Sequence, residues 1–112
     1  MKEEILMVKI HNALKRDGKD FYEATRGNWK VNQARFKHIQ YVAGINDGKV
    51  VCAFRPLEWD VIKEGTETGR KRFNGIEAPN EILLKLQESE SYLTKKFGSG
   101  QAVAYACLSE IE

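Results

Sequence analysis

Two apolar runs flank the dipeptide Asp47-Gly48, and this arrangement constrains the fold more than any other feature of the chain. Asp-Gly is a preferred pair for a two-residue β-hairpin turn, because both central positions need a left-handed backbone conformation. The sequence therefore predicts a hairpin over residues 40–55. The cross-strand pairs of this register are Ile45–Val50, Gly44–Val51, Ala43–Cys52, Val42–Ala53 and Tyr41–Phe54.

Both faces of this hairpin carry apolar or small side chains. A sheet with one face in water alternates polar and apolar residues more cleanly than residues 40–55 do. We therefore expect other elements to cover both faces. A mixed, strongly curved sheet, or a small pseudo-barrel, meets this condition.

The remaining elements follow from apolar runs and turn residues. Residues 4–10 are an apolar run of strand length, but a helix over 2–16 competes, since short apolar runs do not separate the two by periodicity. Asn32 is a good N-cap, and Gly27 stands where a left-handed helix end is expected. The other predicted elements are strands at 57–62, 70–76 and 102–108, short helices at 19–26 and 32–38, and one helix after Pro79 that is broken near 89–91.

The predicted fold class is thus α+β, with two short N-terminal helices and one C-terminal helix. A chain of 112 residues, 42% of them hydrophobic, has the size and composition of one globular domain, which we expect to span residues 1–112. No apolar run approaches the roughly 18 residues that cross a bilayer, and the N-terminus lacks a signal-peptide pattern. We expect a cytoplasmic protein with no membrane contact.

The net charge of +2 is unevenly distributed along the chain. Residues 24–73 carry a local excess of basic groups, whereas residues 74–112 carry an excess of acidic ones. Between Ala24 and Asn46 there is no carboxylate at all. Positive charge interleaved with aromatic rings suits a polyanion that carries bases, although a solvated basic face has the same composition. The cationic and aromatic residues of this segment are Arg26, Trp29, Lys30, Arg35, Phe36, Lys37 and Tyr41.

Tyr22, Arg26 and Trp29 are the first candidate binding group. Tyr22 and Arg26 are four residues apart and share one face of the predicted helix, and Trp29 follows just beyond it. Such a group clamps a base and its phosphate by stacking and bidentate hydrogen bonding. The alternative has Trp29 in the core and Arg26 paired with a surface carboxylate such as Glu23. Lys30 and Arg35 extend the predicted phosphate-binding surface.

Trp59 lies between Glu58 and Asp60 on a predicted strand, so the two carboxylates share one side and the indole takes the other. Trp59 is either a core residue or a stacking platform. Arg70 and Arg72 alternate onto one side of the strand over residues 70–76. They either contact phosphates or keep an edge strand soluble.

No catalytic or metal site is predicted. Cys52 and Cys107 each lie inside an apolar run without zinc-ligand spacing, and we expect a buried, reduced pair. His11 and His38 have no partner in a known nucleophile or metal motif. We expect no cofactor and no metal.

The stretches FYEATRGNWKVN, YVAGINDGKVVCAFRPLEW and GRKRFNG carry a resemblance to a known family. Over residues 5–75 the chain resembles small PUA-like (ASCH/EVE-type) domains of bacteria and phages, some of which lie beside GIY-YIG nuclease modules. The resemblance implies a pseudo-barrel that binds RNA or flipped modified bases. It would place Tyr22, Arg26, Trp29 and Trp59 near such a pocket. No nuclease motif accompanies the domain here.

The leading functional hypothesis is a non-catalytic module that binds DNA or RNA, favouring single strands, and reads a modified or extruded base. Its predicted contacts are Tyr22, Arg26, Trp29, Lys30, Arg35, Trp59, Arg70 and Arg72. One alternative is a binder of nucleotide-like small ligands. Another is a protein-interaction factor, such as an inhibitor or partner of a nuclease, whose acidic C-terminal third meets a basic partner.

Overall fold

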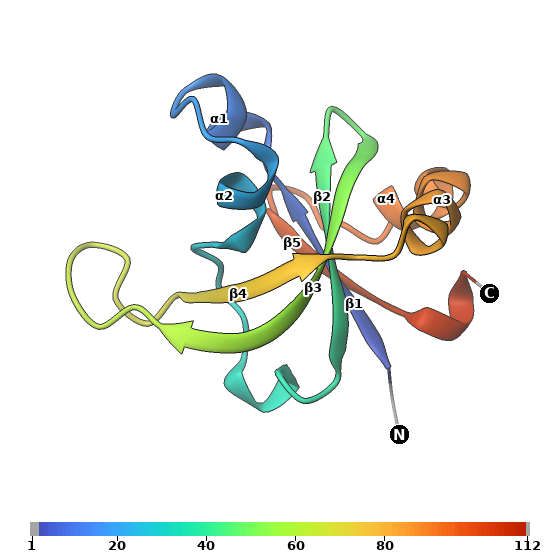
Figure 1. Cartoon of the computed structure of the whole chain (residues 1–112). Helices are drawn as coiled ribbons and strands as arrows, with labels where there is room; N and C mark the ends of the chain where they lie inside the picture. Colours follow the sequence, from blue (N-terminus) through green and yellow to red (C-terminus); the bar gives the residue numbers. More distant parts are fainter. Residues whose placement is uncertain (1–2, 112) are drawn as a thin grey trace.

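The computed structural model describes residues 3–111, which form an open five-stranded mixed sheet with short helices on both faces (Figure 1). The spatial strand order is β4-β3-β2-β1-β5. Strand β1 is parallel to β2, and the other neighbouring strands are antiparallel. The elements are β1 (Glu4–Lys9), α1 (His11–Lys15), α2 (Phe21–Arg26), β2 (Ile39–Asn46), β3 (Lys49–Val61), β4 (Lys71–Glu77), α3 (Asn80–Glu88), α4 (Glu90–Thr94) and β5 (Val103–Cys107).

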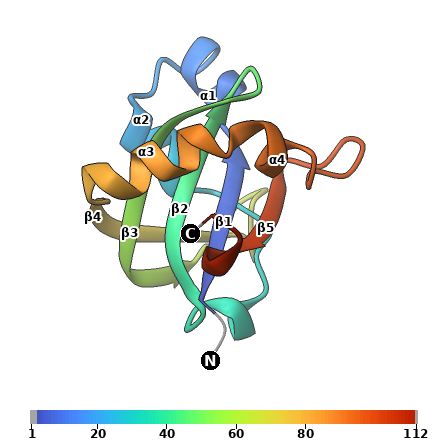
Figure 2. The same cartoon turned by 90° about the vertical axis from the view of Figure 1, so that its right-hand side faces the viewer.

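The strand predicted at residues 4–10 is confirmed as β1, and it lies inside the sheet with four consecutive fully buried residues from Ile5 to Val8. Alternate side chains of β1 enter two separate cores. Ile5 and Met7 pack with α3 and α4, whereas Leu6 and Val8 pack on the side of α1 and α2. Helices therefore cover both faces of the sheet, as the apolar hairpin predicted (Figure 2).

The prediction of a strongly curved sheet or pseudo-barrel is wrong. Strands β4 and β5 lie at opposite ends of the strand order and do not pair with each other, so the sheet stays open. The apolar faces that prompted the prediction are buried by helices instead of by closure of the sheet on itself. The coarser prediction of an α+β fold with a mixed sheet is confirmed.

The hairpin is confirmed, but its register is only partly as predicted. Asp47 and Gly48 have φ values of 55° and 78°, as a type I′ turn requires. Ile45 pairs with Val50 as expected. A β-bulge then shifts the register by one residue, so that the pairs beyond it differ from the predicted ones. These pairs are Gly44–Cys52, Ala43–Ala53 and Val42–Phe54.

Strand β3 does not stop at Pro56 as predicted. It continues for 13 residues, and a second irregularity between Pro56 and Glu58 accommodates the proline in its pairing with β4. Because β4 pairs only from Phe54 onward, residues 49–53 of β3 extend beyond β4. This offset opens one of the surface grooves described below.

The helices differ from prediction mainly at their ends. Helix α1 after β1 was not predicted as a separate element, and the predicted helix at 32–38 is a single 3-10 turn, Gln33–Arg35, capped by Asn32. Gly27 is extended, with φ −179°, so the predicted left-handed helix end is wrong. The C-terminal helix is two helices, α3 and α4, which meet at Ser89 within the predicted break.

The two cysteines are free thiols, with Cys52 buried and Cys107 half-buried. The Cys52 thiol lies 3.3 Å from the hydroxyl of Thr25, and burial raises the pKa of Cys52. Among residues 3–111, none of the helices has the length and apolar character needed to cross a bilayer.

Candidate functional site

A hollow of about 600 Å³ lies between the segment after α2 and the start of β5. We call it the basic hollow. Two aromatic side chains, Trp29 and Tyr105, and two cations, Lys30 and Arg70, line it. Asn28, Gly100, Gln101, Ala102 and Val103 complete the lining. The lining comes from three separate parts of the chain, namely residues 28–30, Arg70 and residues 100–105, and no carboxylate belongs to the described lining.

A second hollow of about 590 Å³ adjoins the basic hollow, because both are lined by Lys30 and Arg70. Its other walls are mostly polar and include Asn32, Thr68 and Lys71, with Val31 as an apolar member. The carboxylate of Glu67 contacts two lining residues of the basic hollow, accepting hydrogen bonds from Asn28 at 2.9 Å and from Arg70 at 3.3 Å. The two hollows together form a strip whose lining carries three cations.

Trp29 is held firmly at the wall of the basic hollow. Its indole N–H donates to the carbonyl of Thr25 at 2.7 Å. Its backbone exchanges two hydrogen bonds with Lys71, at 2.9 and 2.8 Å, as an isolated β-bridge. The indole N–H is thus already used, and Trp29 offers a ligand only the surface of its ring.

Tyr105 is a site residue that sequence reasoning missed. Its ring lies under the guanidinium of Arg35, which is 3.9 Å from the ring centroid. The same guanidinium forms a 2.8 Å ion pair with Glu4, whose carboxylate is largely buried. Burial raises the pKa of the Tyr105 phenol, the charge of Arg35 lowers it, and the carboxylate of Glu4 raises it. The strand at 102–108 was predicted, but sequence alone does not show which residues approach Tyr105.

The free edge of β5 borders the same hollow. Lys9 N–H donates to the carbonyl of Ala102, and Leu108 N–H donates to that of Glu3, so the even-numbered residues of β5 bond to β1. The backbone groups of Val103 and Tyr105 consequently point away from β1. No other strand pairs with this edge within residues 3–111. The hollow therefore has backbone donors and acceptors along one wall.

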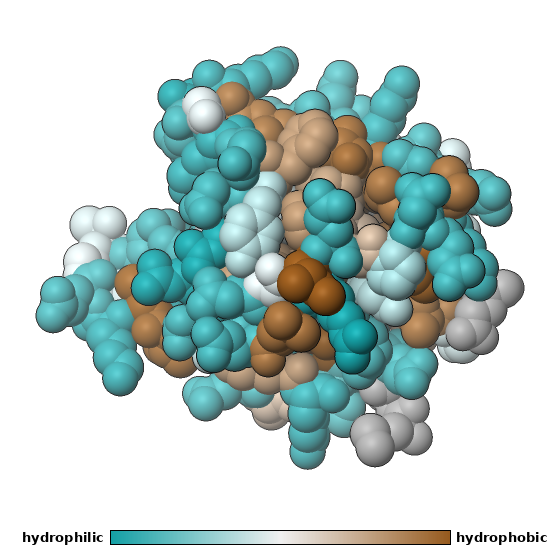
Figure 3. Space-filling model, in the orientation of Figure 1, coloured by the Kyte–Doolittle hydropathy of each residue, from teal (hydrophilic) through white to brown (hydrophobic). Residues whose placement is uncertain are grey.

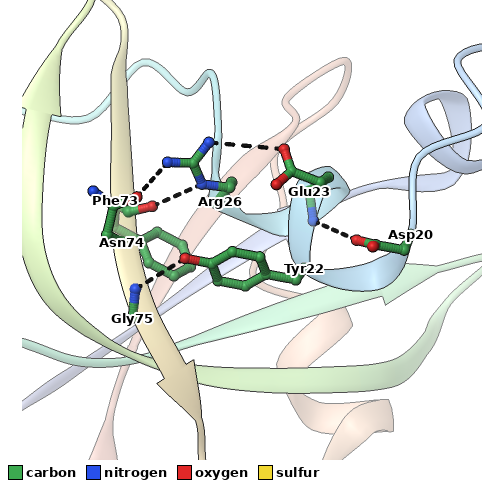
Figure 4. A network of polar contacts seen from close by, with 7 residues as sticks. All are labelled: Asp20, Tyr22, Glu23, Arg26, Phe73, Asn74 and Gly75. Atoms are coloured by element: carbon green, nitrogen blue, oxygen red, sulfur yellow. Dashed lines mark hydrogen bonds and ion pairs between the residues drawn. The ribbon is translucent and has the colours of Figure 1, made fainter.

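Tyr22 and Arg26 line neither hollow, and their side chains form hydrogen bonds to the edge strand β4 (Figure 4). The Tyr22 hydroxyl accepts from the backbone N–H of Gly75 at 3.1 Å, and Arg26 Nε donates to the carbonyl of Phe73 at 3.1 Å. Arg26 also donates to the side chain of Asn74 and lies 3.7 Å from Glu23. These two side chains occupy backbone groups that an edge strand otherwise exposes.

Trp59 stacks on Phe36, with ring centroids 4.7 Å apart and planes at 8°, and also contacts the buried Phe73. Arg72 is exposed on β4, opposite Asp60, and lines neither hollow. The structure thus brings together Trp29, Lys30 and Arg70, and Arg35 contacts the ring of Tyr105, which lines the same hollow. The prediction that Tyr22, Trp29 and Trp59 lie around one pocket is wrong, because Tyr22 bonds to β4 and Trp59 stacks on Phe36.

Within the part of the chain that the structure describes, no cluster of three or more His, Cys, Asp or Glu side chains has the proximity to hold a metal ion. Comparison with protein-family models, with curated proteins and with solved structures finds no match to this chain.

Proposed function

We propose that this protein is a non-catalytic module that binds single-stranded nucleic acid and takes one base into the basic hollow. The observation that carries the proposal is the meeting of two aromatic side chains with Lys30 and Arg70 in one hollow, with no carboxylate among the lining residues that the structure describes. Aromatic faces stack on any base, and cations beside them bind the phosphates that connect the bases.

Each wall of the hollow would contribute a different interaction. Stacking on Trp29 or Tyr105 contributes about 1–3 kcal/mol per base. Lys30 and Arg70, which both hollows share, would hold the phosphate between the stacked base and the next nucleotide. Lys71 in the second hollow extends the cationic strip by one more contact.

The backbone groups at the edge of β5 support recognition of bases in addition to phosphate binding. The outward N–H and C=O groups of Val103 and Tyr105 provide the donor and acceptor that a base edge requires. A base inside a duplex must first be extruded, which costs a few kcal/mol. We therefore expect single strands and lesion-bearing or modified sites to bind more tightly than intact duplex.

The proposal is tested by fluorescence anisotropy with labelled single-stranded DNA and RNA between about 50 and 200 mM salt. We expect log Kd to depend linearly on log salt concentration. Lys30→Ala should lower the magnitude of this slope by about 0.7, the value for one phosphate contact on a single strand. Lys63→Ala is the matched control, because Lys63 is exposed and lines neither hollow. Absence of binding at about 50 mM salt would contradict the proposal.

Base reading is tested separately with an oligonucleotide that carries one abasic position. Val103→Pro removes an outward N–H that does not bond to β1, and proline is tolerated on the solvent side of an edge strand. Loss of one hydrogen bond of about 1 kcal/mol weakens affinity by about fivefold. This loss should appear with the intact oligonucleotide and disappear with the abasic one.

A small anionic ligand related to a nucleotide is the second candidate, and the hollow's volume of about 600 Å³ favours it. Ligand pockets occupy about 300–1,000 Å³. A thermal shift with mononucleotides and none with oligonucleotides would select this function. Membership of the PUA-like (ASCH/EVE-type) domains stays part of the proposal for the base-binding function that the resemblance implies, but the open sheet differs from the pseudo-barrel that it also implies.

A further inference from the structure

A groove of about 530 Å³ lies between α2 and α3, apart from the two hollows described above, and its lining differs in chemistry from that of the basic hollow. It follows from the offset of β3 and β4, since residues 49–53 of β3 extend past the end of β4. Val51, Phe54 and Leu83 give it apolar walls. Phe21, also in its lining, is 47% exposed to solvent. Figure 3 shows apolar surface gathered on this face of the molecule.

The charge on this groove is negative. Asp20 and Glu77 belong to its lining, and no Lys or Arg does among the described residues. Asp20 uses one oxygen to cap α2, accepting from Glu23 N–H at 2.8 Å, and Glu77 forms no ion pair within residues 3–111. The groove shares no lining residue with the basic hollow.

Some backbone groups of β3 in and next to the groove are already hydrogen-bonded. Val50 N–H donates to Glu90, Gln87 donates to the carbonyl of Val50, and Ala78 N–H donates to the carbonyl of Ala53. A partner strand therefore cannot pair with Val50 or with the carbonyl of Ala53 without displacing these bonds. Side chains that enter the groove and charges at its rim remain accessible for recognition.

We propose that this groove binds a basic amphipathic peptide segment of a partner protein. An apolar side chain of the partner enters between Phe21 and Leu83, and Lys or Arg side chains flanking it reach Asp20 and Glu77. A nucleic acid or an anionic membrane is disfavoured at this surface by the two carboxylates. Exposed apolar surface with a charged rim is typical of protein-binding sites.

The test uses a labelled synthetic helical peptide of about 12 residues, roughly three turns, built from Leu on one face and Lys on the other. Its counterpart carries Glu in place of Lys. We expect the basic peptide to bind in anisotropy titrations and the acidic one not to bind. Phe21→Ser and Glu77→Lys should each weaken binding by about tenfold or more.

Leu84→Ser is the matched control for Phe21→Ser. Leu84 is similarly exposed, at 50%, but does not line the groove, and its substitution should leave peptide affinity unchanged. Equal binding of both peptides, or binding unaffected by Phe21→Ser and Glu77→Lys, would overturn the proposal. Sedimentation equilibrium tests whether the groove binds a second copy of this chain instead. A native dimer that becomes monomeric in Phe21→Ser would assign the groove to self-association and would overturn the proposal.

Discussion

The guanidinium of Arg35 stacks 3.9 Å above the ring of Tyr105 while it pairs with the buried carboxylate of Glu4 at 2.8 Å. One side chain therefore joins the 3-10 turn after Asn32 to both β1 and β5. It also places a cation at the Tyr105 ring that lines the basic hollow. Arg35 thus has a structural role in addition to the phosphate contact predicted from the sequence.

Arg35→Ala should lower the free energy of unfolding by about 1–3 kcal/mol, because the buried carboxylate of Glu4 loses its hydrogen-bonded partner. The pKa of Tyr105 should rise further, since the charge of Arg35 lowers it in the native protein. Urea denaturation and an absorbance titration of tyrosinate measure the two effects. Lys37→Ala, at an exposed neighbour, should change neither.

Arg26 and Arg72 are expected to differ in their effect on stability, because Arg26 is hydrogen-bonded to β4 and Arg72 is exposed to solvent. Arg26→Ala removes two hydrogen bonds from β4 and should destabilise the fold by about 1–3 kcal/mol, since the Phe73 carbonyl loses its partner. Arg72→Ala changes an exposed side chain and should stay within about 0.5 kcal/mol of the native protein. Equal destabilisation by the two substitutions, measured by urea denaturation, would refute the role assigned to Arg26.

Gly44 in β2 has no room for a methyl group. A Cβ built there would lie 2.6 Å from Cys52 Sγ and 2.8 Å from Thr25 Oγ1. Gly44→Ala should therefore destabilise the protein by about 1–3 kcal/mol through overpacking. Adding Cys52→Ala removes the sulfur, so the double variant should be more stable than the sum of the two single effects predicts. Thermal unfolding of the four proteins completes the cycle.

Glu110 should make stability depend on acid pH. Hydrogen bonds from Lys96, Tyr92 and the Cys107 N–H lower the pKa of Glu110 from 4.5 to about 2. Because the folded pKa lies below the unfolded one, this stabilisation is present above pH 4.5 and is lost as pH falls towards 2. The melting temperatures of Glu110→Gln and the native protein should differ at pH 7 and converge near pH 2.

Glu88→Gln is the control for this titration, since Glu88 is exposed and forms no ion pair among the described residues. Its melting curve should follow that of the native protein over the whole range. A difference between Glu110→Gln and the native protein that persists unchanged at pH 2 would show that the carboxylate acts through shape and not through charge.

The sequence was most informative where a local pattern determines structure. Asp47-Gly48 located the turn correctly, because left-handed backbone at two successive positions admits few residue types. The bulge beyond Ile45 could not be read from the same residues, since Val51 and Cys52 are both apolar and fit either register. The break near Ser89 was also visible, because the apolar stripe loses its period there.

The candidate site was less predictable, because it depends on which segments the sheet brings together. Tyr22 and Arg26 have the composition of a ligand clamp, yet their polar atoms bond to the edge of β4. Nothing in the sequence indicated that Tyr105 belongs to the site, because Trp29 and Arg35, which lie near it in space, are some 70 residues away in sequence. Charge and aromatic content located the right segment of the chain but not the residues that meet.

The two ends of the sheet differ in their capacity to grow. At the edge of β4, side chains of α2 bond to the Gly75 N–H and the Phe73 carbonyl, so these groups cannot pair with a strand of another chain. At the edge of β5, the outward backbone groups of Val103 and Tyr105 have no partner strand within residues 3–111. Any oligomer or fibril built by extending the sheet would start at Val103 and Tyr105 and would cover the basic hollow as it formed. Occupancy of that hollow by a ligand would then protect the protein against aggregation.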